Sequence, residues 1–333
     1  MFTTAAYVFD REGLILRDAD AVHLNQLNFS FALVKDGCVN GEHWINIDAY
    51  KAFIARHPHI LPVVSVGGWA ADGFSQAAAT PQGRERFVQT TLDLMQAHGF
   101  LGVDIDWEYP GSDEAGIAAS PQDRENFTLL MRALREGLDA LTAQDGKPRL
   151  LATALGAKRE LVELIDNAAV GQIVDQVNLM SYDIQTRSTI SHMTPLYSAD
   201  PRYINSAHSS VGDYTAAGIP KEKIMVGCAY YARLFEAEQG APQLFAPSVI
   251  AGFDTINYRR LMAEEGWTHG YDETACAAYS VKGSRFATHD APDSLAAKGA
   301  YVRQNGLMGL MCWEYGGDRD GELLQAMYES LQP

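Results

Sequence analysis

Three acidic residues alternate along one short, otherwise apolar segment of the chain: Asp104, Asp106 and Glu108. Because successive side chains of a β-strand point to opposite faces, the three acids share one face, and the three apolar residues that alternate with them, from Val103 to Trp107, share the other. Carboxyl groups crowded on a face closed from water raise one another's pKa, so at least one keeps its proton near neutrality. Such a group can act as a general acid. The outermost, Glu108, is the one that a bound molecule would reach.

Two other interpretations of this acidic face are weaker. A solvated edge strand would carry polar side chains where the alternating Val, Ile and Trp residues stand. A divalent-metal site would need ligands from other strands, since hard cations gather several oxygen atoms. The ends of the other predicted strands offer mainly Ser65, Trp69, Tyr182, Asp183, Trp313 and Glu314. Aromatic side chains suit a sugar better than a cation, so we expect neither a metal ion nor another cofactor.

Eight strand-like segments recur along the chain, and stretches with helical spacing separate most of them. The strands are expected at 5–9, 26–32, 61–66, 101–107, 150–154, 174–181, 224–230 and 307–313, and helical spacing marks 84–98, 122–141, 159–168 and 203–217. Continuous apolar strands that alternate with helices indicate a parallel sheet buried on both faces. The pattern predicts an α/β fold, a (β/α)8 TIM barrel. A doubly wound open sheet is the alternative, but the sequence lacks the G-x-G-x-x-G and phosphate-loop motifs that would support it.

One interval interrupts this alternation, between the seventh strand and the last helix–strand unit. The segment from Arg233 to His289 contains several Gly and Pro residues and short strand-like pieces at 277–281 and 285–287. A connection of this length rarely lacks structure of its own, so we expect a small α+β insertion. The predicted catalytic barrel spans 1–232 and 290–333, and the predicted insertion subdomain spans 233–289.

Composition and charge exclude several classes of protein. The 333 residues include 26 Lys and Arg against 42 Asp and Glu, a net charge of −16, so no nucleic-acid partner is expected. No apolar run is long enough to span a membrane. Cys38, Cys228, Cys276 and Cys312 stand singly, which favours reduced thiols over disulfides or a zinc site. The N-terminal residues show no export signal, so we expect a cytoplasmic protein, or one secreted by a route without a visible signal peptide.

The acidic segment is one of six motifs that together resemble glycoside hydrolase family 18, the chitinases and their relatives. Residues 101–108 resemble the D-G-x-D-x-D-x-E signature of that family. The other matches follow in the family's order at 23–32, 65–69, 180–183, 231–233 and 309–314, so the resemblance covers essentially the whole chain. Two positions depart from the family pattern. Leu101 replaces the first Asp of the signature, for which we expect a change in packing only, and Ala232 replaces a common Gly.

The resemblance implies a retaining, substrate-assisted glycosidase. In that mechanism the substrate's 2-acetamido oxygen attacks the anomeric carbon while Glu108 protonates the leaving oxygen. Water then opens the oxazolinium intermediate with Glu108 as base. Asp106 would orient the acetamido group and offset the positive charge, and Asp104 would take up a shared proton. Tyr182 would donate its hydroxyl hydrogen to the acetamido carbonyl.

The resemblance also implies a set of substrate-binding residues. They comprise Met180, Asp183, Tyr231 and Arg233 around the acetamido group and the flanking sugars, Tyr7 and Ser65 beneath Asp104, and the stacking residues Trp69, Tyr109 and Trp313. The three stacking residues are expected because the C–H faces of sugars pack against aromatic rings. Trp267, in the predicted insertion, is a further candidate for the wall of the cleft.

The sequence therefore predicts an enzyme that cleaves β-1,4 linkages, with an N-acetylglucosamine oligosaccharide or polymer as its partner. Chitin, chito-oligosaccharides, peptidoglycan fragments and N-glycan cores all carry the required acetamido group. The alternatives on the same scaffold are a sugar-binding lectin and an endo-β-N-acetylglucosaminidase or peptidoglycan-fragment hydrolase. Inactive relatives usually lose the last Glu of the signature, whereas Glu108 is present here, which favours the enzyme. The sequence predicts no oligomeric state.

Overall fold

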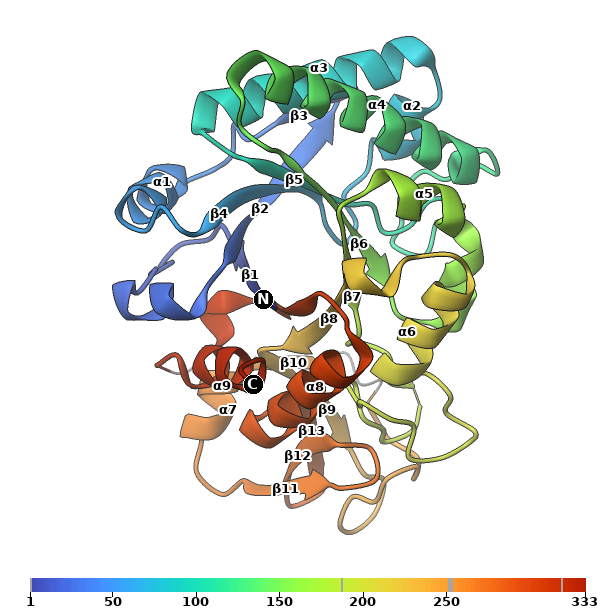
Figure 1. Cartoon of the computed structure of the whole chain (residues 1–333). Coiled ribbons are helices and arrows are strands. Elements are labelled where there is room, and N and C mark those ends of the chain that lie inside the picture. The colour runs from blue at the N-terminus through green and yellow to red at the C-terminus, as the bar shows by residue number, and fades with distance from the viewer. Residues whose placement is uncertain (1, 187, 251–253, 319) are drawn as a thin grey trace.

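A closed barrel of parallel strands forms the centre of the molecule (Figure 1). The computed structural model describes residues 2–186, 188–250, 254–318 and 320–333. Within them, the barrel strands are β1 (Thr3–Phe9), β2 (Gln26–Lys35), β4 (Leu61–Gly67), β5 (Gly102–Asp106), β6 (Leu150–Gly156), β7 (Gln176–Met180), β8 (Ile224–Ala229) and β14 (Gly309–Trp313). Each strand pairs with its neighbours, and β1 pairs in parallel with both β2 and β14, which closes the ring. The predicted (β/α)8 TIM barrel is confirmed. A short strand, β3 (Cys38–Asn40), extends β2 as a hairpin.

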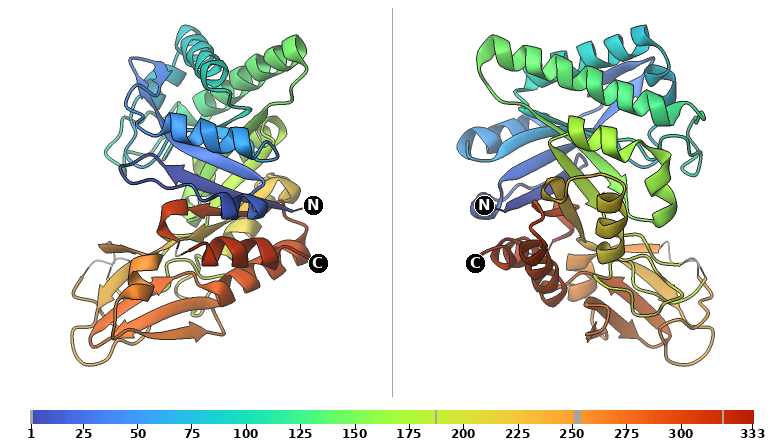
Figure 2. Two further views of the ribbon diagram at one scale, coloured as in Figure 1. Left: turned by 90° about the vertical axis from the view of Figure 1, so that its left-hand side faces the viewer. Right: turned by 45° about the vertical axis from the view of Figure 1, so that its right-hand side comes forward.

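Helices surround the barrel on its outer side (Figure 1, Figure 2). The α-helices are α1 (Ile47–Arg56), α2 (Phe74–Ala78), α3 (Pro81–His98), α4 (Asp123–Asp145), α5 (Asn167–Ile173), α6 (Ala207–Ala216), α8 (Pro292–Asn305) and α9 (Glu322–Ser330). Short 3-10 helices lie at Asp18–His23, Arg159–Leu164, Lys221–Lys223 and Tyr315–Gly317. Local sequence sets their ends: Thr80 caps α3 by accepting from the Gly83 N–H, and Gly99 ends it in the left-handed conformation. In the described part of the chain, no helix is both long and apolar enough to cross a bilayer.

One predicted helix is wrong in its boundaries. The single helix expected at 159–168 is instead a 3-10 helix, Arg159–Leu164, followed by the separate helix α5. Asp166 divides the two, because its side chain accepts from the Ala169 N–H and so caps α5. An N-cap residue has non-helical dihedral angles, and a helix therefore cannot run through it.

The strand β5 separates acidic from apolar side chains as its alternation predicts. The Trp107 ring, just after β5, stacks on Phe74 of α2 with ring centroids 5.4 Å apart, and it meets Phe127 of α4 edge-on at 6.0 Å. Val103 and Ile105 are wholly buried in the same apolar layer. The helices thus hold the apolar face of β5, and the acidic face is turned toward the interior of the barrel.

The two departures from the family pattern leave the backbone pairing intact. Leu101 continues the ladder at the start of β5: its N–H donates to the Pro62 carbonyl at 2.8 Å, and its own carbonyl accepts from Leu150 at 3.0 Å. Ala232 is wholly buried and pairs with Ile256 in the adjacent strand. Because the ladder uses only backbone groups, neither side chain is needed for it.

A second, antiparallel sheet stands beside the barrel (Figure 2). Its strands are β10 (Asp254–Asn257), β9 (Tyr231–Glu236), β13 (Arg285–His289), β12 (Ala277–Lys282) and β11 (Thr268–Asp272), in that spatial order, and the helix α7 (Tyr258–Ala263) follows β10. The strand-like pieces expected at 277–281 and 285–287 are thus β12 and β13. Residues 251–253 of the predicted insertion lie outside the described residues. Because β9 begins two residues after β8 ends, this sheet adjoins the carboxyl end of the barrel.

Candidate active site

Asp104 forms the buried base of a column of three carboxyl groups. It is fully enclosed, and three donors reach it: the Tyr7 hydroxyl and the Ser65 hydroxyl, each 2.8 Å from Oδ2, and the Asn178 amide, 3.0 Å from Oδ1. Burial raises the pKa of Asp104, and these hydrogen bonds act in the opposite direction. The three donors come from β1, β4 and β7, so the closed barrel brings them together.

Asp106, one layer higher, has a less complete set of partners. Burial, followed by the nearby charges of Glu108 and Asp104, raises its pKa well above the usual range. Among the side chains that the structure describes, its Oδ1 atom is buried and has no hydrogen-bond partner. A buried polar atom without a partner costs free energy, so this oxygen is prepared to accept a hydrogen bond from a bound molecule.

Glu108 is the outermost carboxyl group of the column. Burial raises its pKa to about 7, the charge of Asp183 adds to the increase, and a hydrogen bond with Tyr109 opposes it. A carboxyl group with a pKa near neutrality can donate a proton in one step and accept one in the next. Glu108 lines the cleft above the column, so its proton is within reach of a ligand.

Tyr182 and Met180 extend from the carboxyl end of β7. Burial, with the charges of Asp106 and Glu108, raises the pKa of Tyr182 well above the usual range, so its hydroxyl stays protonated and can donate. Met180 packs with Tyr7 in an apolar cluster at the barrel interior, and Tyr182 packs against that cluster. Both residues therefore border the column of acids.

Asp183 connects the barrel to the second sheet. Its side chain accepts from the Tyr231 hydroxyl at 2.8 Å and from Nε and Nη2 of Arg233 at 2.6 and 2.7 Å. Asp183 has a positive φ of 57°, a conformation that Asp tolerates better than most residues. Asp183 is thus fully partnered, unlike Asp106.

Aromatic side chains form one wall of the cleft. Trp313 stacks on Phe31 at a centroid distance of 5.4 Å and meets Tyr7 edge-on at 5.9 Å. Trp69 lies at the rim, where 59% of its surface is exposed, with Tyr109 edge-on to it at 6.5 Å. These flat surfaces suit the C–H faces of a sugar. The stacking of Phe31 on Trp313 was not predicted from the sequence.

The cleft that contains these groups has a volume of about 650 Å³. The expected residues that line it are Tyr7, Trp69, Asp106, Glu108, Tyr109, Met180, Tyr182, Asp183, Tyr231, Arg233 and Trp313. Asp104 and Ser65 are fully buried and do not line the cleft, whereas Tyr7, which was expected beneath Asp104 together with Ser65, does line it. In the described part of the chain, no three His, Cys, Asp or Glu side chains are grouped to hold a metal ion.

Several contributors to the site were missed from the sequence. Asn178 bonds both Asp104 and the Tyr7 hydroxyl, and its position two residues before Met180 on β7 was the available signal. Arg11 and Glu314 form an ion pair at the cleft, 2.7 Å between Nη2 and Oε1. Glu314 was named from the sequence only as a residue at a strand end, and Arg11 was not named. Because they follow the adjacent strands β1 and β14, only that position could have indicated the pair.

Trp267 does not wall the cleft, so that part of the prediction is wrong. It is buried in the apolar core of the second sheet beside Leu261, and the Arg285 guanidinium carbon lies 5.4 Å from its ring centroid. The bulk of the indole is better accommodated between this sheet and α7 than at a wetted surface.

Comparison with known proteins identifies the family. The profile described as glycosyl hydrolases family 18 matches residues 4–318. The chain is 33% identical to Chitinase A1 of Niallia circulans over 312 residues, which cover 86% of this chain and 44% of that protein, and 31% identical to Endochitinase 1 of Metarhizium robertsii, covering 91% and 78%. The solved structure of a family 18 N-acetylglucosaminidase from Paenibacillus barengoltzii superimposes with a TM-score of 0.93 at 35% identity, covering 99% of this chain and all of the other. The chain belongs to glycoside hydrolase family 18.

Proposed function

We propose that this chain hydrolyses β-1,4 bonds that follow an N-acetylglucosamine unit, by a retaining mechanism in which the substrate supplies the nucleophile. One observation carries the proposal: among the side chains that the structure describes, the Oδ1 of Asp106, in the column that Glu108 ends, is buried without a hydrogen-bond partner. A secondary amide offers a suitable N–H donor for such an oxygen. The acetamido group of the sugar is that amide.

The proposed first step uses three groups at once. The acetamido N–H donates to Asp106 while the acetamido oxygen attacks the anomeric carbon. The bond from that carbon to the leaving oxygen breaks, and the proton of Glu108 passes to the leaving oxygen. Tyr182 donates to the attacking oxygen and fixes its direction. The product of this step is a positively charged oxazolinium, which the carboxylate of Asp106 stabilises.

The second step reverses the role of Glu108. The ionised Glu108 takes a proton from a water molecule, and the oxygen of that water attacks the anomeric carbon. The bond between this carbon and the oxazolinium oxygen breaks, which restores the acetamido group. Retention follows, because the two displacements occur on opposite faces of the sugar. Asp104 and Asp106 share the remaining proton during the cycle, as expected for carboxyl groups that titrate together.

Replacing Glu108 by Gln tests the proposal most directly. Because the acid is lost and the shape is kept, kcat on a fluorogenic chitobioside is expected to fall on the order of a thousandfold. Binding of a chito-oligosaccharide, measured by calorimetry, is expected to change little. Glu136→Gln, an exposed glutamate on α4, is the matched control and should keep its activity.

Three outcomes would redirect the assignment. Turnover by Glu108→Gln near the wild-type rate would remove Glu108 from the acid role. Binding without turnover by the wild-type chain would indicate the lectin. Cleavage of a matched substrate that lacks the 2-acetamido group would contradict substrate assistance. A defined series of chito-oligosaccharides would then separate release of single N-acetylglucosamine units from internal cleavage.

A further inference from the structure

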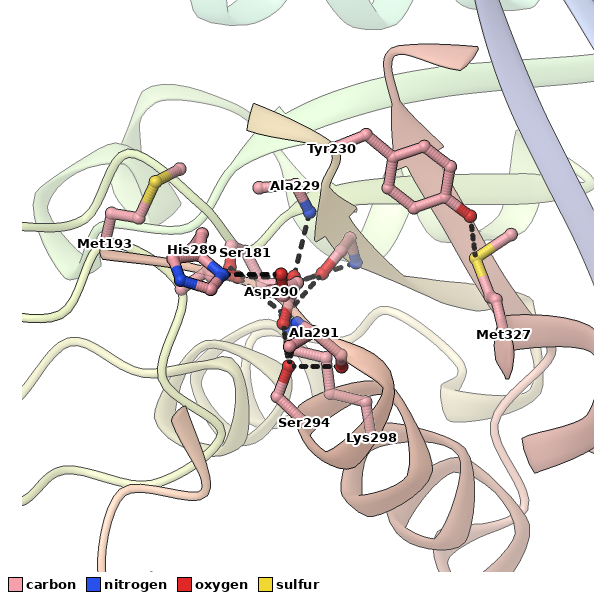
Figure 3. A network of polar contacts seen from close by, with 12 residues as sticks. Ser181, Met193, Ala229, Tyr230, His289, Asp290, Ala291, Ser294, Lys298 and Met327 are labelled. Atoms are coloured by element: carbon pink, nitrogen blue, oxygen red, sulfur yellow. Dashed lines mark hydrogen bonds and ion pairs between the residues drawn. The ribbon is translucent and has the colours of Figure 1, made fainter. Parts of the chain in front are cut away.

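A second polar network surrounds the buried ion pair of Lys298 and Asp290 (Figure 3). Lys298 of α8 and Asp290, which follows β13, are both fully buried, with Nζ 2.7 Å from Oδ2. The other two donors of Lys298 are also used, on Thr194 Oγ1 at 2.6 Å and on the Gly227 carbonyl at 3.2 Å. The pair therefore joins three segments that are far apart in sequence.

The network occupies the point at which β7 and β8 separate. Their register ends at Leu179 opposite Val226. Beyond it, the Ser181 hydroxyl replaces the ladder: it donates to the Gly227 carbonyl at 3.0 Å and accepts from the Gly227 N–H at 2.8 Å. Thr194 in turn donates to the Ser181 carbonyl at 2.9 Å. Ser181 is held on both its side chain and its backbone.

Asp290 holds the end of β8 in the same way. Its Oδ2 accepts from the Ala229 N–H at 2.8 Å, and its Oδ1 accepts from the Ser294 hydroxyl at 2.7 Å. A buried ion pair rarely adds more stability than an apolar pair of similar size, so stability alone does not explain this one. It does satisfy backbone groups that have lost their ladder partners, which an apolar pair could not do.

Tyr182 lies directly against this network. It follows Ser181 in the chain, and a Cβ built on Gly227 would come within 2.9 Å of its Cε1 atom. Met193, the neighbour of Thr194, packs with Tyr231, and the Tyr182 ring packs against both. A shift of Ser181 or Gly227 would therefore move the Tyr182 ring.

We infer that Lys298 and Asp290 are positioning residues that act through Thr194 and Ser181 to fix the Tyr182 hydroxyl at the acetamido group. The inference rests on the proposed function, since it gives Tyr182 a role in the attack. The network then raises the rate of the reaction in addition to stabilising the fold.

Thr194→Val tests the inference without leaving a charge unpaired. It removes the hydroxyl that links Lys298 to the Ser181 carbonyl and keeps the branched shape. We expect kcat on the fluorogenic chitobioside to fall on the order of tenfold with little change in KM, since a small misplacement of a reacting group is costly. Thr194→Ser, which keeps the hydroxyl, should restore the wild-type kcat.

The effect must also depend on Tyr182. In a Tyr182→Phe background, Thr194→Val should have no further effect on kcat, because the hydroxyl that it displaces is already missing. Arg135→Met is the matched control: it breaks an ion pair with Asp175 at the other end of β7, 2.9 Å between Nη1 and Oδ2, and should lower stability without changing kcat. Every variant is assayed well below its own midpoint of thermal unfolding.

Two results would overturn the inference. A folded Thr194→Val protein with wild-type kcat would show that the link is not needed. An equal loss of kcat from Thr194→Val with and without the Tyr182 hydroxyl would show that the network acts elsewhere, with the proposed function intact. Full activity of Tyr182→Phe alone would instead contradict the proposed function, and the inference would fall with it.

Discussion

Asp106 and Asp290 are both buried aspartates near the carboxyl end of the barrel, and they differ in what surrounds them. Asp290 has a lysine beside it, and both of its oxygens accept hydrogen bonds. Asp106 has two further carboxyl groups as neighbours and one oxygen without a partner among the described residues. The first arrangement satisfies the chain itself. The second leaves one oxygen able to accept a hydrogen bond, as the proposed function requires of a residue that binds the substrate.

The largest expected effect is on stability at Asp290. Asp290→Asn leaves Lys298 buried without its counter-charge, and we expect a loss of about 3–5 kcal/mol in the free energy of unfolding. Denaturant unfolding followed by circular dichroism measures this loss. A stability within 1 kcal/mol of wild type, roughly the scale of one neutral hydrogen bond, would contradict the assigned role of the ion pair.

Asp106→Asn is expected to give the opposite pattern. It removes a group whose charge is unfavourable where it lies, so the midpoint of thermal unfolding at pH 8 should not fall. The same change removes the stabilisation of the oxazolinium, and kcat should fall by about a hundredfold or more. A protein with wild-type kcat and reduced stability would make Asp106 a structural residue like Asp290.

The pH dependence should reveal the raised pKa of Glu108. Its pKa lies near 7 in the folded chain against 4.5 ordinarily, so burial favours the protonated form. This shift adds roughly 3 kcal/mol to the free energy of unfolding below about pH 4.5. The added stability is lost as the pH rises through about 7. Thermal unfolding of wild type and Glu108→Gln across this range measures it.

The same group must be protonated for the first step, so kcat/KM should decline above about pH 7. A profile that stays flat to pH 9 would place the acid elsewhere.

The smallest expected effect concerns Asp183, which lines the cleft like Asp106 but has both carboxyl oxygens hydrogen-bonded like Asp290. Its charge raises the pKa of Glu108, so Asp183→Asn should move the basic limb of the kcat/KM profile to lower pH, by less than about one unit because Asp183 is partly exposed to solvent. A profile measured at low salt gives the clearest comparison. A shift to higher pH would contradict the electrostatic contribution assigned to Asp183.

The alternation of residue types along β5 was enough to predict which face carries its acidic side chains, and the recurrence of eight strands separated by helices predicted the barrel. A period of two on one strand places Asp104, Asp106 and Glu108 together whatever the rest of the chain does. The family motifs then indicated Tyr182, which follows β7, and Trp313, which ends β14, and both residues line the cleft.

Contacts between segments far apart in the chain could not be predicted. Asn178, Phe31 and Lys298 lie on different elements, and although Asn178 and Phe31 stand in or next to family motifs, nothing local shows which distant side chains they contact. Trp267 shows the reverse error. As an aromatic residue of the insertion it was expected at the wall of the cleft, but it is buried in the apolar core of the second sheet.

The sequence alone therefore determined which groups can react, since strand alternation and side-chain chemistry are local properties. Only the tertiary structure decided which buried acid is satisfied and which is not. That distinction depends on partners brought from other elements: Lys298 of α8 reaches Asp290, whereas no described side chain bonds the Oδ1 of Asp106. Desolvation and hydrogen bonding act through space, and closure of the barrel sets both.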